Sequence, residues 1–288
     1  MPATAKQIFM SKTNIKNKKT LKNILERLYS RYNHQKFIPP DPLQFVYRYK
    51  NKADMEIAGF LSALFAYGAV EQIEKFVTAL LGKMGSSPAG FIRNFSAKDK
   101  KLFKSLKYRF NTGEDIIKLF EILKKVLIRH GSLEKLFLAG YNDSDKNIIP
   151  AAAKFIQALN CKGSRGLKFL LSDPANGGTC KRLLLFLRWM VRKDEVDAGL
   201  WKKIDKTKLV VPVDVHMGRL SRILGLYKRK TINLKTAIEI TEGFAAICPQ
   251  DPVKYDFALC RIGILENCTG RKNRHCPDCE LFELCERK

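Results

Sequence analysis

The sequence lacks an apolar run long enough to cross a membrane, and we expect no secretory leader. Its longest apolar stretch, residues 57–70, is interrupted by Ser62, Tyr67 and two glycines. A spanning helix needs about 20 apolar residues. The N-terminal segment is rich in lysine but has no apolar centre of the kind found in signal peptides. We therefore expect a cytoplasmic protein, associated with the nucleoid if the source is bacterial, with no membrane partner.

Acidic residues are also scarce. The 28 Asp and Glu residues stand against 53 Lys and Arg, which gives a formal net charge of +25 at pH 7. Such a charge favours polyanionic partners, because each cation that neutralises a phosphate releases a condensed counterion. Nucleic acid is the first candidate and an anionic membrane surface is the second. A well-solvated basic surface is the third alternative.

Strand-like alternation of apolar and polar residues is missing as well. Apolar residues recur instead at three- and four-residue spacing along the chain. Hydrophobic residues make up 45% of the 288 residues, which is enough for a core and for two modest domains. The sequence predicts an all-α protein. The expected helices lie near residues 19–32, 41–50, 54–67, 69–84, 88–95, 97–107, 113–130, 132–139, 147–160, 165–172, 178–193, 213–225, 233–247 and 251–265.

Capping residues mark several of these helix starts. A capping side chain directly followed by proline occurs at Asp41, Ser87 and Asp251. In this arrangement the side chain accepts an unpaired backbone N–H, and the proline fills the first helical position. Thr112 and Asp115 have the spacing of a capping box, which predicts a helix that begins at residue 113.

Four of the eight cysteines gather at the C-terminal end, at Cys268, Cys276, Cys279 and Cys285. In a reducing compartment such a cluster is more often a metal site than a disulfide framework. Structural zinc usually takes two close pairs of ligands, whereas iron–sulfur clusters accept varied spacing. Only one close pair is present here, so the spacing favours iron–sulfur over zinc. Unligated thiols are the third alternative.

Three cations, Arg271, Lys272 and Arg274, lie between the first two of these cysteines. A loop that is pinned by a metal and carries three positive charges is suited to contact phosphates. A solvated basic loop is the alternative.

The segment 268–285 resembles the cysteine loop of the endonuclease III family, which are DNA glycosylases of the helix-hairpin-helix type. The family's loop has one residue fewer between its first two cysteines. The resemblance implies that the four cysteines bind a [4Fe–4S] cluster, and that the basic residues of the loop face the DNA backbone.

A second segment, residues 211–219, reads Val-Pro-Val-Asp-Val-His-Met-Gly-Arg and resembles the family's Val-Asp-Thr-His-x-x-Arg motif. The resemblance implies that Asp214 is catalytic. At a helix start, backbone N–H groups and the helix dipole favour the ionised carboxylate. Such a group can stabilise positive charge at C1′ of the sugar or help to deprotonate a nucleophile. The alternative is a plain N-cap. His216 is either a DNA contact or a structural histidine.

Residues 171–183 correspond to the family's hairpin, although two adjacent glycines replace its Gly-x-Gly. Gly177 and Gly178 are expected to expose amides at the start of a helix, which suits an anion. The resemblance implies that Lys181 is the nucleophile of a lyase, and phosphate binding is the alternative. A free lysine has a pKa near 10.4, so burial or the cations Arg182 and Arg188 would have to lower it. We also expect Arg182 to contact DNA.

Residues 57–67 resemble a family helix of the form Ile-Ala-x-x-Leu-Ser-Ala-Gln, in which the Gln enters the gap left by the flipped nucleotide. Leu64 occupies that position here. We expect it to be a core leucine, so that lesion recognition differs from the well-known members.

The resemblance implies an all-α, two-domain helix-hairpin-helix glycosylase-like fold. The expected parts are a disordered basic tail (1–18), a helical domain with the hairpin (51–205), and a cluster-bearing domain (19–50 with 206–288). Residues 194–212 are expected to form a polar connection. The function expected is base excision in DNA repair: a DNA glycosylase, with possible abasic-site lyase activity, that acts as a monomer on a flipped base of double-stranded DNA. The alternatives are a non-catalytic iron–sulfur nucleic-acid binder and a zinc-bound structural adaptor.

Overall fold

The computed structural model describes residues 15–159, 163–265 and 268–285, and it is built almost wholly of helices. The α-helices are α2 (Ile15–Tyr32), α3 (Lys52–Leu64), α4 (Val70–Gly82), α5 (Pro88–Asn94), α6 (Gly113–His130), α7 (Leu133–Leu138), α8 (Ile149–Ala158), α9 (Arg165–Leu170), α10 (Lys181–Val191), α11 (Val215–Ile223), α12 (Leu234–Ala245) and α13 (Asp256–Leu265). Short 3-10 turns are η1 (Gln35–Phe37), η2 (Pro42–Arg48), η3 (Asp99–Leu102), η4 (Pro174–Asn176), η5 (Lys206–Lys208), η6 (Cys276–Asp278) and η7 (Phe282–Leu284). The prediction of an all-α protein is confirmed.

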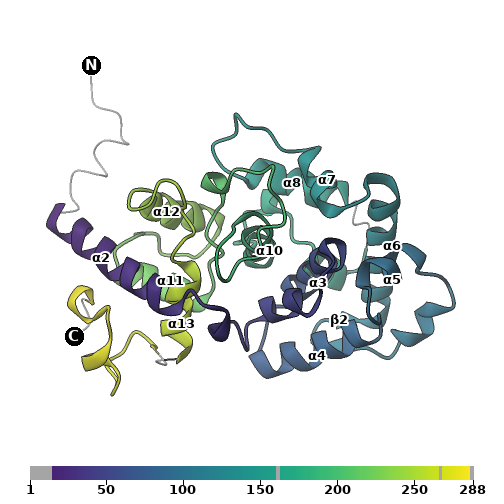
Figure 1. Ribbon diagram of the computed structural model, residues 1–288, viewed down its shortest axis with the longest axis horizontal. Coiled ribbons are helices and arrows are strands. Elements are labelled where there is room, and N and C mark those ends of the chain that lie inside the picture. Colours follow the sequence, from purple (N-terminus) through teal and green to yellow (C-terminus); the bar gives the residue numbers. More distant parts are fainter. Residues whose placement is uncertain (1–14, 160–162, 266–267, 286–288) are drawn as a thin grey trace.

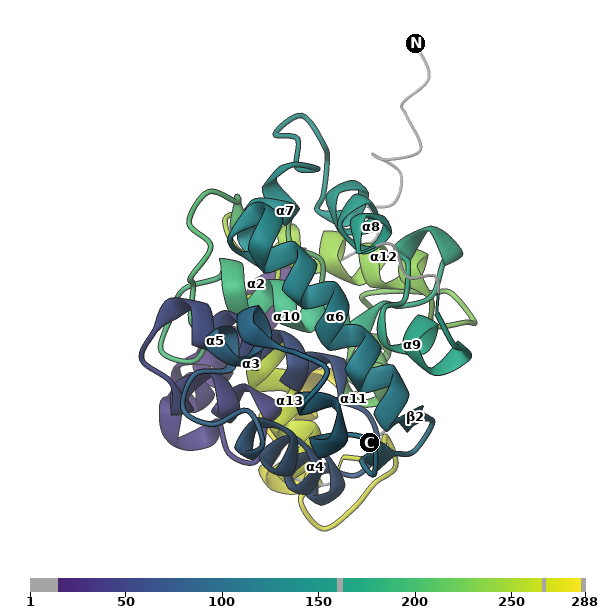
Figure 2. The same cartoon turned by 90° about the vertical axis from the view of Figure 1, so that its right-hand side faces the viewer.

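Helix α10 lies at the centre of the molecule (Figure 1). Helices α2, α11, α12 and α13 lie to its left in that view, together with the cysteine loop, and α3 to α6 lie to its right. Helix α10 packs on α3, while α11 packs on α13 and α13 packs on α2. In the turned view, α6 crosses in front of α10 (Figure 2). Elements from both ends of the chain thus surround one central helix.

Most of the expected helix starts are confirmed. Asp41 caps η2 and Ser87 caps α5, each followed by proline at the first or second position. Thr112 and Asp115 form the predicted capping box of α6, which spans the predicted residues 113–130. Among the described helices, none combines the length and the apolar composition needed to span a bilayer.

The prediction of a helix at residues 97–107 is wrong. The chain forms only η3 there and then an antiparallel hairpin of β1 (Lys107–Tyr108) and β2 (Asn111–Thr112), whose turn places Arg109 at a positive φ of 51°. Tyr67 explains the difference, because its hydroxyl lies 2.6 Å from Asn111 Oδ1 and holds the hairpin against the end of α3. A local periodicity cannot report a contact across 44 residues.

Asp251 is not the helix cap that was expected. Helix α13 begins five residues later, at Asp256. The Asp251 carboxylate instead accepts a hydrogen bond from Arg192 Nε at 2.8 Å. A buried guanidinium is a stronger partner for this carboxylate than a backbone amide.

The connection at residues 194–212 is also more buried than its polar composition suggested. Asp197 and Val196 are fully buried, and the indole of Trp201 donates a hydrogen bond to Glu56 Oε1 at 2.8 Å. The expected basic tail is shorter than predicted, since α2 already begins at Ile15, and the rest of that tail lies outside the described residues.

Two buried arginines organise this part of the core. Arg188 lies in α10, and Arg192 directly follows its last residue. Arg188 pairs with Asp197 (3.2 Å) and with Asp256. Arg192 pairs with Asp197 (2.9 Å), Asp251 and Asp194. Burial alone would lower the pKa of each guanidinium, but the aspartates outweigh it and raise both pKa values. The network therefore fixes α10 to the start of α13.

We expect replacement of Arg192 by methionine to destabilise the fold strongly. The change removes the cation that pairs with Asp194 and Asp251 and leaves Asp197 with Arg188 alone, and breaking such a buried pair costs about 3–5 kcal/mol. Urea unfolding measures this loss. The matched control is Lys118→Met, which removes an exposed i,i+3 ion pair with Glu121 that is worth about 0–1 kcal/mol. Equal shifts for the two variants would contradict a structural role for the network.

Candidate active site

A cleft of about 670 Å³ opens between α10, the start of α11 and α13. Lys181, Asp214, His216, Asp256 and Cys260 all line it. The opposite wall comes from the end of α3 and from α9, through Ala66, Tyr67, Gly68, Phe169 and Leu170. Residues that are far apart in the sequence thus converge on one site, and they include five of the predicted site residues: Gly178, Lys181, Arg182, Asp214 and His216.

Lys181 and Asp214 face each other across this cleft. Lys181 Nζ lies 3.6 Å from Asp214 Oδ2, and both side chains are partly exposed, at 32% and 21%. Asp214 is also the N-cap of α11, since its Oδ1 accepts a hydrogen bond from the backbone N–H of Met217 at 2.7 Å. The cap fixes the carboxylate and directs its second oxygen toward the lysine. The capping and the chemical interpretations of Asp214 are therefore compatible.

Asp256 is a candidate that the sequence interpretation missed. It is 2% exposed at the first turn of α13, where it pairs with Arg188 and lines the cleft. Burial raises the pKa of Asp256 to about 6, despite the nearby Arg188 guanidinium, and the charge of Asp214 raises it further. Two carboxyl groups at one site with different environments are typical of acid–base chemistry. A charged residue at the start of a mostly apolar helix was the available signal.

Cys260 lies one turn beyond Asp256, and its Sγ donates to Asp256 Oδ1 at 3.7 Å. Burial raises the pKa of the Cys260 thiol well above its ordinary value, and both neighbouring aspartates add to the effect. A protonated thiol is a poor nucleophile, so Cys260 is not a second reactive centre in the cleft.

His216 is held in place by contact with α13. A methyl group added at Gly263 would lie 2.6 Å from His216 Nδ1 and 2.8 Å from its Cβ, so the absence of a side chain there admits the ring. Nδ1 is buried and has no hydrogen-bond partner among the described residues. The ring therefore contributes to the packing of α11 on α13. A role in DNA binding stays a prediction.

The two hairpin glycines lie before the helix rather than within its first turn. Helix α10 begins at Lys181, preceded by Cys180 in the left-handed conformation (φ 48°), so the predicted start at residue 178 is three residues early. Gly177 has φ 75°, and its N–H donates to Pro174 O at 3.0 Å. That amide is used inside η4. The anion site expected from Gly177 is therefore not formed by its own N–H, whereas Gly178 is exposed with open space around it.

Arg182 holds three segments together. Its guanidinium donates to Leu64 O at 2.9 Å and to Phe169 O, and it lies over the rings of Phe169 (4.2 Å) and Tyr67 (5.1 Å). Burial lowers the pKa of Arg182 to about 10. These contacts position the guanidinium, and Arg182 also lines the cleft, so that a contact between Arg182 and DNA stays a prediction. Leu64 itself is 2% exposed, which confirms it as a core leucine.

The cysteine loop packs on α2 and on α11. Glu280 pairs with Arg31 at 3.1 Å and with Arg27 at 3.5 Å, Leu281 is buried, and Arg219 donates to the carbonyl of Cys268. These contacts hold a segment that contains only the two short turns η6 and η7.

The four predicted ligands, Cys268, Cys276, Cys279 and Cys285, are all partly buried, and none forms a disulfide. The backbone N–H of Asn273 points to Cys276 Sγ at 3.2 Å, and such hydrogen bonds suit a thiolate bound to iron. Within the described residues, no three His, Cys, Asp or Glu side chains converge as ligands of one metal ion. Four free thiols on one short loop, one of which receives a backbone N–H, are a donor set of the kind that a [4Fe–4S] cluster takes. Binding of the cluster stays a prediction.

The loop cations Arg271, Lys272 and Arg274 are all exposed. Arg274 Nε lies 3.2 Å from His275 Nε2. Their exposure is compatible with both interpretations of this loop, a contact to phosphates and a solvated basic loop.

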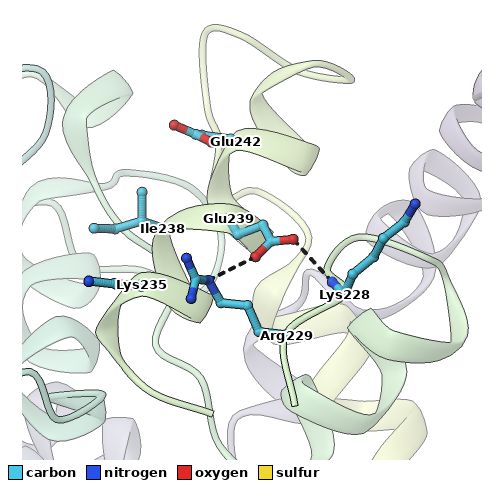
Figure 3. Close-up of a pocket in the computed structure, with 6 residues that line it drawn as sticks. All are labelled: Lys228, Arg229, Lys235, Ile238, Glu239 and Glu242. Atoms are coloured by element: carbon cyan, nitrogen blue, oxygen red, sulfur yellow. Dashed lines mark hydrogen bonds and ion pairs between the residues drawn. The ribbon is translucent and has the colours of Figure 1, made fainter. Parts of the chain in front are cut away.

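A second pocket of about 650 Å³ lies on α12 and the turn before it (Figure 3). Glu239 accepts a hydrogen bond from Lys228 N at 3.0 Å and pairs with Arg229 at 3.2 Å. Lys235, Ile238 and Glu242 complete its lining. The ion pair of this pocket joins a guanidinium to a carboxylate, and none of the predicted site residues lines it, so the cleft is the stronger candidate.

We expect Gly263→Ala to destabilise the protein and to displace α11, which carries His216. The added methyl collides with His216, which must move α11 and with it Asp214, and overpacking of this kind costs about 1–3 kcal/mol. Thermal unfolding measures the cost. Gly82→Ala is the matched control, because Gly82 is also helical, yet a methyl there meets nothing within 4 Å. A Gly263→Ala protein as stable as the control would refute the contact.

Comparison with known proteins gives one match. A family model described as "Protein of unknown function (DUF2400)" matches residues 41–265, which include the cleft but end before the cysteine loop. No curated protein and no solved structure matches the chain.

Proposed function

We propose that this protein, which belongs to the DUF2400 family, is a DNA base-excision enzyme: a DNA N-glycosylase with abasic-site lyase activity. The observation that carries the proposal is the pairing of Lys181 with Asp214, at 3.6 Å, in a cleft large enough for a flipped nucleotide. An amine beside a carboxylate is the arrangement needed to form a covalent bond to a sugar and to manage the proton that this bond displaces. The resemblance of residues 211–219 and 268–285 to the endonuclease III family supports the same reaction.

In the proposed reaction, Asp214 takes a proton from the Lys181 ammonium. The amine then attacks C1′ as the bond between C1′ and the base nitrogen breaks, and the base leaves with the bonding electrons and gains a proton from solvent. The forming bond from the amine to C1′ offsets the positive charge that develops there. As the sugar ring opens, Asp214 returns its proton to O4′ and the nitrogen gives one proton to solvent, which leaves a protonated Schiff base on Lys181. Asp214 then takes a proton from C2′, and the 3′ phosphate leaves with the electrons of its bond to C3′. Met217 N–H holds Asp214 in position throughout.

The four C-terminal cysteines would hold a [4Fe–4S] cluster in this proposal, and the cluster would stabilise the loop rather than take part in the bond changes. The exposed loop cations Arg271, Lys272 and Arg274 would then contact phosphates of double-stranded DNA. The two-domain glycosylase-like arrangement belongs to the same proposal, and it would place the cleft between the domains.

Substitution of Lys181 and of Asp214 tests the chemistry. With a panel of damaged duplexes, we expect borohydride to trap a covalent complex with the wild-type protein and none with Lys181→Ala. Asp214→Asn keeps the N-cap but removes the proton acceptor, so base release should slow about 10²- to 10⁴-fold without loss of stability. Lys125→Ala is the control, because Lys125 is an exposed cation on α6 that does not line the cleft. A Lys181→Ala protein that is trapped as well as wild type would end the assignment.

Metal analysis of protein purified without oxygen tests the cluster. We expect about four irons per chain and a visible thiolate-to-iron absorption band, both lost in Cys276→Ser and Cys279→Ser. Cys248→Ser is the control, since Cys248 is also partly buried but lies outside the loop. Protein that contains zinc, or that is colourless and metal-free, would reject the cluster and favour a structural adaptor.

A non-catalytic nucleic-acid binder of the same fold is the second candidate. The observation that favours it is the altered hairpin, in which the Gly177 amide is used within η4 and the helix begins only at Lys181. Salt-sensitive DNA binding, with no base release or strand cleavage on any lesion, would support this candidate over the enzyme.

A further inference from the structure

The β1–β2 hairpin presents an exposed aromatic ring beside the cleft. Phe110, at the hairpin turn, is 63% exposed, and Phe169 at the end of α9 is 37% exposed. Exposed aromatic side chains are usually found where they have a partner, because each leaves a large apolar area in water. Neither the proposed reaction nor the packing of the core uses Phe110.

Tyr67 connects the two phenylalanines. The rings of Tyr67 and Phe110 are nearly parallel, at 8°, with centroids 6.5 Å apart. Phe169 meets both rings edge-on, at 5.0 Å from Tyr67 and 5.6 Å from Phe110. The three rings form one continuous aromatic surface, which we call the aromatic platform.

The aromatic platform is held rigidly. Burial raises the pKa of Tyr67 to about 12, so its hydroxyl keeps its proton and donates to Asn111 Oδ1 at 2.6 Å. The Tyr108 hydroxyl returns a hydrogen bond to the carbonyl of Tyr67 at 2.5 Å. These bonds tie both strands of the hairpin to the end of α3. A ligand would therefore bind to a surface that is already ordered, at little cost in conformational entropy.

The platform adjoins the cleft and is surrounded by positive charge. Tyr67 and Phe169 line the cleft themselves. The Arg109 guanidinium lies 5.5 Å from the Phe110 ring, and a methyl added at Gly68 would lie 2.9 Å from Arg109 Nη1. Lys107 and Lys168 are exposed nearby in sequence on β1 and α9. None of these three cations forms an ion pair within the described part of the chain.

From these observations we propose that Tyr67, Phe110 and Phe169 form a stacking site for an unpaired nucleobase at the mouth of the cleft. Aromatic rings stack on the face of any base, while Arg109 and its neighbouring lysines suit the phosphates on either side. This inference rests on the proposed function, since it names the part of the DNA that lies next to the flipped nucleotide. The site would also provide the contact to the opposite strand that Leu64, being buried, does not make.

Binding to an uncleavable duplex tests the site separately from catalysis. The probe is a duplex with 2-aminopurine opposite a tetrahydrofuran abasic analogue, which contains an unpaired base and cannot be processed. Stacking on an aromatic ring is worth about 1–3 kcal/mol per base, so Phe110→Ala should weaken binding about 10- to 100-fold. The loss for a fully paired duplex should be much smaller. Phe110→Trp should bind as well as wild type, with its fluorescence quenched by the stacked base.

Two controls separate stacking from general effects. Ile128→Ala removes an equally exposed apolar side chain on α6 and should leave binding unchanged. The dependence of affinity on salt should be the same for Phe110→Ala as for wild type, whereas Arg109→Ala should reduce the slope by about one. Equal losses of Phe110→Ala on paired and unpaired duplexes would overturn the site, as would no loss at all. So would a Phe110-dependent affinity for anionic vesicles or for an acidic protein that leaves DNA binding unchanged.

Failure of the stacking site and failure of the proposed function give different results. If wild-type protein binds the uncleavable duplex through Phe110 but releases no base from any lesion, the stacking site stands and the enzyme does not. If base release is found but Phe110→Ala binds and reacts as wild type does, only the stacking site is rejected.

Discussion

The structure depends on one buried ion network, in which Arg188 and Arg192 neutralise four aspartates between α10 and α13. Burial of so many charges is tolerated only because each has a partner at short range. The network fixes the axis of α10, whose first residue is Lys181, against α13, on which α11 packs. Since Asp214 caps α11, the distance between the lysine and the carboxylate follows from this arrangement rather than from their own weak, partly exposed ion pair.

The site combines structural and chemical roles in single residues. Asp214 uses one oxygen to cap α11 and leaves the other for Lys181. Asp256 neutralises Arg188 and at the same time places a second carboxyl group in the cleft, where burial raises its pKa to about 6. Few other side chains could make the structural contact and also place a carboxyl group in the cleft. Of the two interpretations that the sequence left open for Asp214, the geometry shows the cap and leaves an oxygen free for the proposed chemistry.

Local signals predicted the local structure. The capping box at Thr112 set the start of α6, and the apolar spacing set most of the helices, because both depend on residues three or four apart. Two of the failures involve distant partners. Asp251 was expected to cap a helix but binds Arg192, 59 residues away, and the hairpin near Tyr108 is fixed by Tyr67. Charge composition and spacing cannot reveal such partners. Lys181 and Asp214 were found only because motifs marked them separately.

The charges of the cleft differ from those of the surrounding surface in how far they are paired. Although the chain carries a net charge of +25, most cations of the cleft are paired with carboxylates: Lys181 with Asp214, Arg188 with two aspartates, and Arg261 with Asp41 at 2.9 Å. The remaining one, Arg182, is engaged by two backbone carbonyls and two aromatic rings. A phosphate would gain little by entering it. Attraction for a polyanion must therefore come from exposed cations outside the cleft, while the interior suits an uncharged group with an apolar face. A nucleotide turned out of a duplex has that division, since its phosphates stay at the surface and its base enters the cleft.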